Sequence, residues 1–188
     1  MLVLKYIKPL LVIIIVLAAD QIFKLWVKNN MQLGEEIDVI PNMFILHFTE
    51  NNGFAFGFEF GGKIGKFILT SFRIVAVGFI AYILIKMIKQ NAPSGFNISL
   101  SLIFVGAIGN IIDSVIYGVI FNYAPLFHGR VVDMLYFPLI KGSYPDWFPA
   151  VGGDPFIFFR PVFNISDTAI TTGVLVILIF YRGFLKKF

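Results

Sequence analysis

Polar side chains that could do chemistry lie inside or beside long apolar runs of the sequence, namely Asp20, Lys24, Asn110, Asp113, Asp133 and Asp167. Ionisable groups are costly inside a bilayer, so each of them is a candidate functional residue. Asp133 follows the third apolar run in GRVVDM, and Asp167 begins the fourth in FNISDTAI. An acid in the first turn of a helix also favours the helix dipole, and Asn164 could cap that helix, so a structural role for Asp167 stays open.

Asp133 and Asp167 could together hydrolyse a peptide bond. Two carboxyl groups close to each other cannot both ionise, so one holds a proton while the other acts as a base. The base would take a proton from a water molecule that attacks the amide carbonyl. The acid would polarise that carbonyl and then protonate the leaving amine. This reaction needs no covalent intermediate, metal ion or cofactor.

The other four polar residues also have structural interpretations. Asp20 and Lys24 are four residues apart and can pair on one helix face, for which helix packing is the simpler explanation. Asn110 and Asp113 share a face with two glycines and could hydrogen-bond between helices. At 1.5 Å per residue, Asp20 lies roughly 18 Å from Lys8, in the outer half of a hydrocarbon core about 30 Å thick. The same holds for Asn110, so the polar groups converge on one layer near the outer face.

Other hydrolytic chemistries lack the residues that they need. The sequence contains no cysteine, which excludes a thiol nucleophile and a Cys-ligated metal. His47 and His128 are the only histidines and no His-Glu-x-x-His motif occurs, so no metal site is expected. Ser114 and Ser166 lie near the aspartates, but no Gly-x-Ser-x-Gly motif supports a serine nucleophile. For His128, close in sequence to Asp133, an ordinary polar loop residue is the favoured interpretation.

The composition is that of an integral membrane protein. Of the 188 residues, 58% are hydrophobic and 14% charged, whereas soluble domains are about 25% charged. A helix needs about 20 apolar residues to cross a bilayer, and four stretches qualify, at about 9–29, 66–88, 98–121 and 167–185. The first is longer than the apolar region of a signal peptide, so we interpret it as a retained helix. We therefore expect an all-α membrane protein, one domain over residues 1–188 with four transmembrane helices.

Basic residues indicate the orientation of these helices. They flank the apolar runs at both termini and around the 89–97 turn: Lys5, Lys8, Lys86, Lys89, Arg182, Lys186 and Lys187. By the positive-inside rule both termini are then cytoplasmic, and the segments at about 30–65 and 122–166 face outward. The same residues account for the net charge of +4, so no nucleic-acid partner is expected.

The two outer segments differ in pattern. In the first, Phe44, Leu46 and Phe48 recur with the period of two that is typical of a half-buried strand. Asn52-Gly53 then supplies a turn. This pattern predicts a small β-sheet resting on the outer membrane face. The second segment is rich in Pro, Gly and aromatic residues, and over 137–162 we expect an irregular loop or an interfacial lid.

Five blocks of the sequence resemble, in order, those of the signal peptidase II family, the lipoprotein signal peptidases. They are DQIFK at 20–24, NNGFAFG at 51–57, GAIGNIIDS at 106–114, GRVVDM at 129–134 and FNISD at 163–167. One block would be weak evidence, whereas five in order across four predicted spans are specific. The resemblance covers nearly the whole chain.

The resemblance implies a set of site residues. Asp133 and Asp167 fall on the family's catalytic pair. Matched polar positions that would line the site and orient the substrate or the aspartates are Asn51, Asn110 and Asn164. Matched positions that would support the fold are Asp20, Lys24, Asp113, Gly53 and Gly109.

The resemblance also implies an activity and a location. The family cuts diacylglyceryl-modified prolipoproteins on the amino side of the lipidated cysteine, and it is the target of the cyclic peptide antibiotic globomycin. The implied location is the bacterial cytoplasmic (inner) membrane, among membrane lipids, with the active site near the periplasmic face. No cofactor is expected, and nothing requires more than a monomer.

The chain departs from the family pattern at several positions. Ser114 stands where an arginine usually follows the third-helix aspartate. We hypothesise that Arg130, beside Asp133, supplies that charge and helps to orient the site. Met134 stands where phenylalanine is usual, and Ser166 where alanine is usual. The loop between the two aspartates is also longer than in the common form of the family.

Two other classes of function remain as alternatives. A small transporter would use intramembrane Asp and Lys residues as a proton relay, and it predicts an inverted repeat with polar residues in both halves of the membrane. The sequence has no internal repeat, and its inner half is almost purely apolar. A non-catalytic membrane scaffold would leave Asp133 and Asp167 dispensable.

Overall fold

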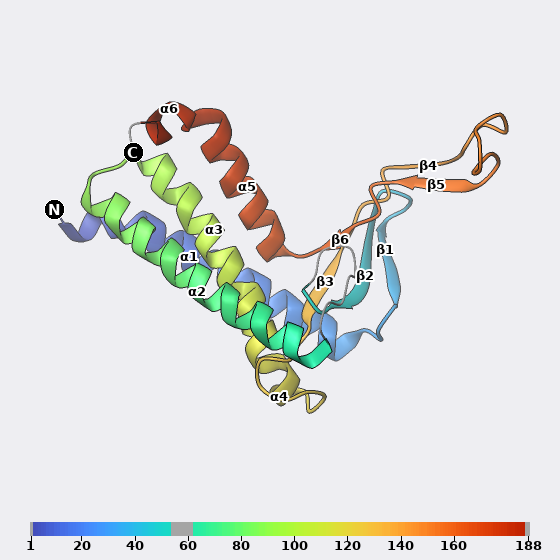
Figure 1. Ribbon diagram of the computed structural model, residues 1–188, viewed down its shortest axis with the longest axis horizontal. Coiled ribbons are helices and arrows are strands. Elements are labelled where there is room, and N and C mark those ends of the chain that lie inside the picture. The colour runs from blue at the N-terminus through green and yellow to red at the C-terminus, as the bar shows by residue number, and fades with distance from the viewer. Residues whose placement is uncertain (1, 54–61, 187–188) are drawn as a thin grey trace.

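A bundle of helices carries a small β-sheet at one end, and both chain termini lie at the other end (Figure 1). The computed structural model describes residues 2–53 and 62–186. The helices are α1 (Leu2–Asn30), α2 (Gly62–Lys89), α3 (Ser94–Ile112), the π-helical turn η2 (Asp113–Tyr117), α4 (Gly118–Ile120), α5 (Ile165–Phe180) and α6 (Arg182–Leu185). The strands are β1 (Glu36–Ile40), β2 (Phe44–Asn51), β3 (Val131–Tyr136), β4 (Ile140–Ser143), β5 (Pro155–Phe158) and β6 (Val162–Phe163).

Three helical segments within the described residues are long and apolar enough to cross a membrane. They cover Lys5–Asn30, Gly62–Lys89 and Ser94–Ile120, close to the ranges that the sequence predicts. α5 is also apolar but has 16 residues, which at 1.5 Å per residue is about 24 Å. The fourth transmembrane helix therefore stays a prediction.

The helix faces that do not pack inside the protein are strongly apolar. On α2, Ile64, Phe72 and Val75 are 73%, 68% and 72% exposed. Exposed apolar surface of this extent marks a membrane or protein contact. It agrees with the membrane class that the composition predicts.

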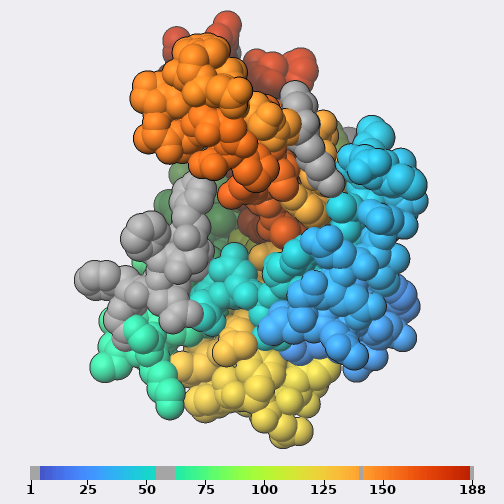
Figure 2. Space-filling model, turned by 90° about the vertical axis from the view of Figure 1, so that its right-hand side faces the viewer, coloured from blue at the N-terminus to red at the C-terminus, as the bar shows by residue number. Residues whose placement is uncertain are grey.

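The sheet is antiparallel with the strand order β1-β2-β3-β6. The strand predicted from the alternation over 44–49 is confirmed as β2. The prediction of an irregular loop over 137–162 was wrong, because this segment contains the hairpin of β4 and β5 and ends at β6. The Tyr144 and Phe156 rings of the hairpin lie 5.2 Å apart, and such cross-strand aromatic pairs stabilise short strands. Figure 2 views the end of the molecule that carries the sheet and shows the hairpin (orange) at one edge of it.

One hydrophobic core joins the sheet to α1 and to the end of α3. Its buried members are Val27, Met31, Leu46, Phe48, Tyr117, Val132 and Met134. Val132 and Met134 flank Asp133 along β3 and are fully buried. Side chains of a strand alternate between its two faces. The Asp133 side chain therefore lies on the face of β3 opposite to the one that Val132 and Met134 bury in this core.

α5 packs closely on α3 because glycines lie between the two helices. A Cβ atom on Gly106 would lie 2.3 Å from the Ser166 carbonyl oxygen, and one on Gly173 would lie 2.5 Å from the Ser99 carbonyl oxygen. Close approach of helix backbones through small residues is the usual way in which helices associate in membranes. This packing brings the first turn of α5 against the polar part of α3.

Substituting Gly109 with alanine should destabilise the protein by about 1–3 kcal/mol through overpacking. The new Cβ would lie 2.1 Å from Ser166 Oγ and 2.7 Å from Asp20 Oδ2, so both side chains would have to shift, and Asp20 with them out of its ion pair. Thermal unfolding in detergent measures the effect. The matched control is Gly78→Ala on α2, where the added Cβ has no atom within 4 Å. Equal melting temperatures for the two variants would contradict the prediction.

Candidate active site

Asp133 and Asp167 come from different elements that meet where the sheet joins the helices. Asp133 lies inside β3 and is 4% exposed, whereas Asp167 lies in the first turn of α5 and is half-buried. β6 pairs with β3 through Leu135 and Phe163, so the chain enters α5 directly beside Asp133. A pair of aspartates 34 positions apart in numbering is thereby brought to one place.

Asn164 connects the two aspartates. Its side-chain Nδ2 donates to Asp133 Oδ1 over 2.7 Å. Its Oδ1 accepts from the backbone N–H of Asp167 over 2.9 Å, while Asp167 Oδ2 accepts from the backbone N–H of Asn164 over 3.3 Å. This reciprocal pattern is a capping box at the start of α5. The cap that the sequence predicts is confirmed, and the same amide also holds the Asp133 carboxyl.

Asn110 holds the Asp167 carboxyl from α3. Its Nδ2 donates to Asp167 Oδ1 over 2.8 Å. Its Oδ1 accepts from Lys24 Nζ over 2.9 Å and from Asn164 Nδ2 over 3.1 Å. The orientation of the Asn110 side-chain amide is therefore fixed, because its oxygen accepts from two donors and its nitrogen donates to one acceptor.

Asn51 approaches Asp133 from the neighbouring strand. It ends β2, where it lies opposite Val131 of β3, and its Nδ2 donates to Asp133 Oδ2 over 3.4 Å. Its Oδ1 accepts from the backbone N–H of Gly53 over 2.7 Å. Gly53 has a φ of +88°, a conformation that glycine adopts readily. Residues 54–57 of the same sequence block lie outside the described residues.

A buried ion cluster lies beneath these asparagines. Lys24 Nζ lies 3.0 Å from Asp20 Oδ2 and 2.8 Å from Asp113 Oδ2, and all three side chains are almost fully buried. Asp113 Oδ2 accepts from the backbone N–H of Val132 over 3.2 Å, and Asp20 Oδ1 accepts from that of Ser166 over 2.9 Å. The cluster thus links α1 and the start of η2 to the residues directly before Asp133 and Asp167. The predicted pairing of Asp20 with Lys24 is confirmed.

The electrostatic environment of Asp133 favours its neutral form. Burial raises the pKa of Asp133 to about 7, and the charge of Asp167 acts in the same direction. The hydrogen bonds from Asn51 and Asn164 and the charge of Lys24 oppose this rise. Two interacting carboxyl groups titrate as a pair, so at neutral pH the site can hold one shared proton. Among the described residues, no group of three or more His, Asp or Glu side chains is placed to hold a metal ion.

The comparisons with known proteins decide the family. The model of the family described as signal peptidase (SPase) II matches residues 12–182. The chain belongs to the signal peptidase II family. Its members cleave signal peptides from prolipoproteins, so the chain is related to peptidases of lipoprotein maturation.

Relatives of this signal peptidase II family member agree in sequence and in fold. A lipoprotein signal peptidase of Porphyromonas gingivalis is 46% identical over 185 residues, covering 90% of this chain and 80% of the relative. One of Amoebophilus asiaticus is 40% identical over 177 residues, covering 89% and 75%. Two solved structures described as bacterial membrane enzymes have TM-scores of 0.63 and 0.64 at 28% and 26% identity. The first match covers 95% of this chain and 87% of the solved chain, and the second covers 93% and 92%.

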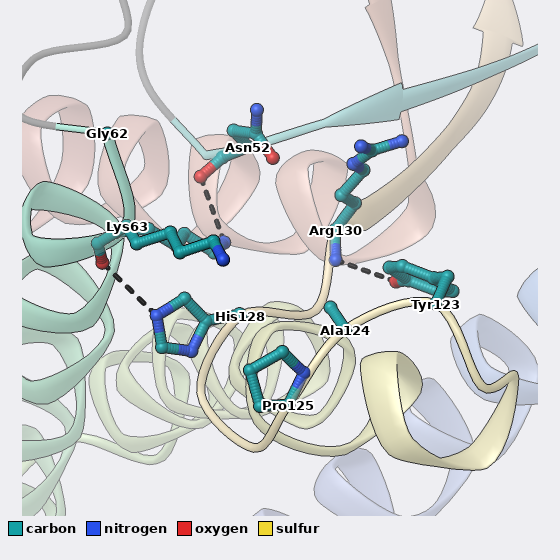
Figure 3. Close-up of a pocket in the computed structure, with 9 residues that line it drawn as sticks. Asn52, Gly62, Lys63, Tyr123, Ala124, Pro125, His128 and Arg130 are labelled. Carbon is teal, nitrogen blue, oxygen red and sulfur yellow. Dashed lines mark hydrogen bonds between the residues drawn. The ribbon is translucent and has the colours of Figure 1, made fainter.

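Arg130 and His128 lie in a pocket of about 360 Å³ beside the start of α2 (Figure 3). The Arg130 guanidinium is 3.1 Å from Glu50 Oε2, and the His128 ring nitrogens face the backbone carbonyls of Leu126 and Lys63. These contacts join the loop that carries His128 and Arg130 to β2 and to the start of α2. They are consistent with the interpretation of His128 as a structural polar residue.

Among the described residues, a cation of α2, Lys66, contacts Ser114. Lys66 is 5% exposed, and its Nζ donates to Ser114 Oγ over 3.4 Å and to the Asn52 carbonyl oxygen over 2.9 Å. The role of Arg130 in orienting substrate stays a prediction, because its contacts are with the neighbouring loop and β2.

Sequence reasoning missed three residues that this signal peptidase II family member uses around the site. They are Gln21, which donates to Asp113 and accepts from Tyr117, and the two α2 cations Lys66 and Arg73. A signal for the two cations was present, since each interrupts or borders an apolar run. Both lie within the predicted span at about 66–88, where single charges hardly change the apolar pattern.

Proposed function

We propose that this chain is a membrane-embedded aspartyl endopeptidase that removes signal peptides from diacylglyceryl-modified prolipoproteins. It would cut on the amino side of the lipidated cysteine. The observation that carries the proposal is the bridge through Asn164, which donates to Asp133 and caps the helix turn that bears Asp167. Asn164 thus holds one carboxyl group with its side-chain amide and the other with its backbone N–H. One of these carboxyls is buried and the other half-buried, which suits water activation by an aspartate pair.

The two aspartates take different roles in this proposal. Asp133 is the acid, since burial and the neighbouring charge raise its pKa to about 7 and let it hold the shared proton. Asp167 is the base, because it is more exposed and accepts from the Asn110 side chain and the Asn164 backbone N–H. Donors of this kind stabilise a carboxylate.

The reaction then proceeds through one water molecule. Asp167 takes a proton from the water as its oxygen attacks the scissile carbonyl carbon. Asp133 donates a hydrogen bond to the carbonyl oxygen, which carries the developing charge, and afterwards gives its proton to the leaving amine. Asn51 and Asn164 keep the Asp133 carboxyl in place during both steps.

The membrane placement follows from the substrate. Two acyl chains hold the substrate in the bilayer, since each buried methylene contributes about 0.8 kcal/mol. We place the sheet on the outer face of the inner membrane, α5 as the fourth transmembrane helix of a single domain, and both termini in the cytoplasm. Trp147 and Phe148, which are 78% and 45% exposed near the hairpin tip, would contact the lipid interface, where aromatic residues are enriched. Globomycin-type inhibitors would occupy the same site of a monomeric enzyme.

A matched pair of substrates tests the function. One prolipoprotein is prepared with and without the diacylglyceryl group on its cysteine, and each form is incubated with detergent-purified protein. Mass spectrometry should show a new N-terminus at the lipidated cysteine for the modified form and no product for the unmodified form. Equal cleavage of both forms would refute the lipid requirement, and a folded protein inert to the modified form would refute the function.

The rate of cleavage should depend on pH with one limb near neutrality. Because Asp133 acts as the acid, kcat/KM should fall as the pH rises through about 7, where this carboxyl loses its proton. The measurement is kcat/KM between pH 5 and 9, in a detergent whose headgroup does not titrate in that range. A flat profile up to pH 9 would show that a protonated Asp133 is not needed.

A further inference from the structure

Arg73 is a charged side chain far from either end of α2. Counted from Gly62 at 1.5 Å per residue, it lies about 17 Å along the helix, well inside the candidate span Gly62–Lys89. Its neighbours Phe72 and Ile74 are exposed apolar residues. A charge at such a depth is costly and is usually retained for a functional reason.

The Arg73 side chain packs against the turn that follows β2. Its Nη2 donates to the Gly53 carbonyl oxygen over 2.6 Å. A Cβ atom on Gly53 would lie 2.5 Å from Arg73 Nη1, so only a glycine leaves room for the guanidinium there. The charged group is therefore in direct contact with the backbone of the turn.

This turn is the support of Asn51. The Gly53 N–H donates to Asn51 Oδ1 over 2.7 Å, and the other end of the Asn51 amide donates to Asp133 Oδ2. A continuous path of contacts thus runs from Arg73 through Gly53 and Asn51 to the buried aspartate. A shift of the guanidinium would shift the donor on Asp133.

Among the described residues, the charge of Arg73 has no close carboxylate partner. Within residues 2–53 and 62–186, no carboxylate lies within ion-pair distance of it, and its buried Nη1 has no hydrogen-bond partner. The guanidinium does interact electrostatically with Asp167. A half-buried positive charge acts more strongly on a nearby carboxyl than an exposed one, because less solvent screens it.

Lys66 makes the equivalent contact one residue earlier in the turn. It precedes Arg73 by seven positions, so both side chains lie on the same face of α2. Lys66 Nζ donates to the Asn52 carbonyl oxygen, and Arg73 donates to that of Gly53. Two cations of α2 therefore hold two successive carbonyl groups, and Lys66 also contacts Ser114, where the family pattern places an arginine.

We propose that Arg73 is a positioning residue of the aspartate site, supplied from α2. It holds the turn of residues 51–53 so that Asn51 reaches Asp133. Through this hydrogen bond it acts on the Asp133 carboxyl. This inference rests on the proposed function for its catalytic consequence, whereas the effect on the carboxyl groups does not depend on it.

The test compares Arg73→Gln and Arg73→Lys with the matched control Lys86→Gln, which removes an exposed cation near the other end of the same helix. Infrared titration of protein labelled with 13C-aspartate follows the carboxyl groups without substrate, and prolipoprotein cleavage gives kcat and KM. In Arg73→Gln, Asp133 should ionise at a higher pH than in the wild type, because the turn no longer holds Asn51, whose hydrogen bond lowers the pKa of Asp133. Its kcat should fall on the order of 10²-fold with KM nearly unchanged.

Arg73→Lys separates charge from geometry. It keeps the positive charge, so the titration should stay close to that of the wild type, while kcat falls in part because lysine lacks the planar fork of arginine. Lys86→Gln should match the wild type in both measurements. An Arg73→Gln protein whose aspartates titrate as in the wild type overturns the proposal.

Two further outcomes, a variant that does not fold and a wild type that does not cut prolipoprotein, can be told apart from a failure of this proposal. If Arg73→Gln does not fold, Gly53→Ala displaces the guanidinium instead and should give the same loss of kcat. Wild-type kcat in a folded Gly53→Ala protein would overturn the proposal. If the wild type does not cut prolipoprotein, the proposed function has failed, while the infrared titration still decides whether Arg73 acts on the Asp133 carboxyl.

Discussion

Replacing Asp133 or Asp167 with asparagine should lower kcat for prolipoprotein cleavage on the order of 10³–10⁴-fold. Asparagine keeps the shape of the side chain, but it can neither take a proton from water nor give one to the leaving amine. KM should change little, because the lost interaction exists mainly in the transition state. The double variant should be no slower than either single variant, since the two residues act as a unit.

The controls for these variants are Asp146→Asn and Asp154→Asn. Both residues lie between β4 and β5, are exposed, and undergo the same chemical change. Thermal unfolding of every variant shows that the protein is folded, and kcat is measured with the lipid-modified substrate. Wild-type cleavage by either folded variant at position 133 or 167 would rule out the aspartate pair, and cleavage by both would favour the scaffold alternative.

The helices and the candidate site were largely predictable because their signals are local. An apolar run of about 20 residues identifies a span without knowledge of its neighbours, and α1, α2 and α3 follow the predicted ranges. Asp20 and Lys24 pair across one helical turn, and Asn164 caps the helix that follows it. The remaining contacts between blocks followed from the resemblance, since spacing alone does not place Asn110 against Asp167.

The parts that could not be predicted depend on tertiary contacts. β4 and β5 have four residues each and are stabilised by pairing across a connection of eleven residues, so no period appears in the sequence. The Lys66 contact with Ser114 joins residues 48 positions apart, whereas Arg130 was favoured only because it is close to Asp133 in sequence. Arg73 was hidden for a similar reason, since the carbonyl that it binds belongs to another element.

Removing the charge of Lys24 should destabilise the protein by about 3–5 kcal/mol, because it leaves two carboxylates buried without a cation. Lys24 is fully buried, and in Lys24→Met both Asp20 and Asp113 lose their ion-pair partner. The free energy of unfolding is measured by denaturant titration in lipid bicelles. The matched control is Lys89→Met, an exposed lysine at the end of α2, which should cost little.

A neutral cluster separates the cost of an unpaired charge from the loss of packing. The triple variant Asp20→Asn, Lys24→Met and Asp113→Asn keeps the side-chain shapes at 20 and 113 but buries no charge, so it should be more stable than Lys24→Met alone. If both variants are equally unstable, packing rather than charge explains the loss.

The pH profile of Lys24→Met gives a second readout, since Lys24 lowers the pKa of Asp133. In Lys24→Met that pKa should therefore rise above about 7, and the falling limb of kcat/KM should move to higher pH, which a loss of packing alone would not cause.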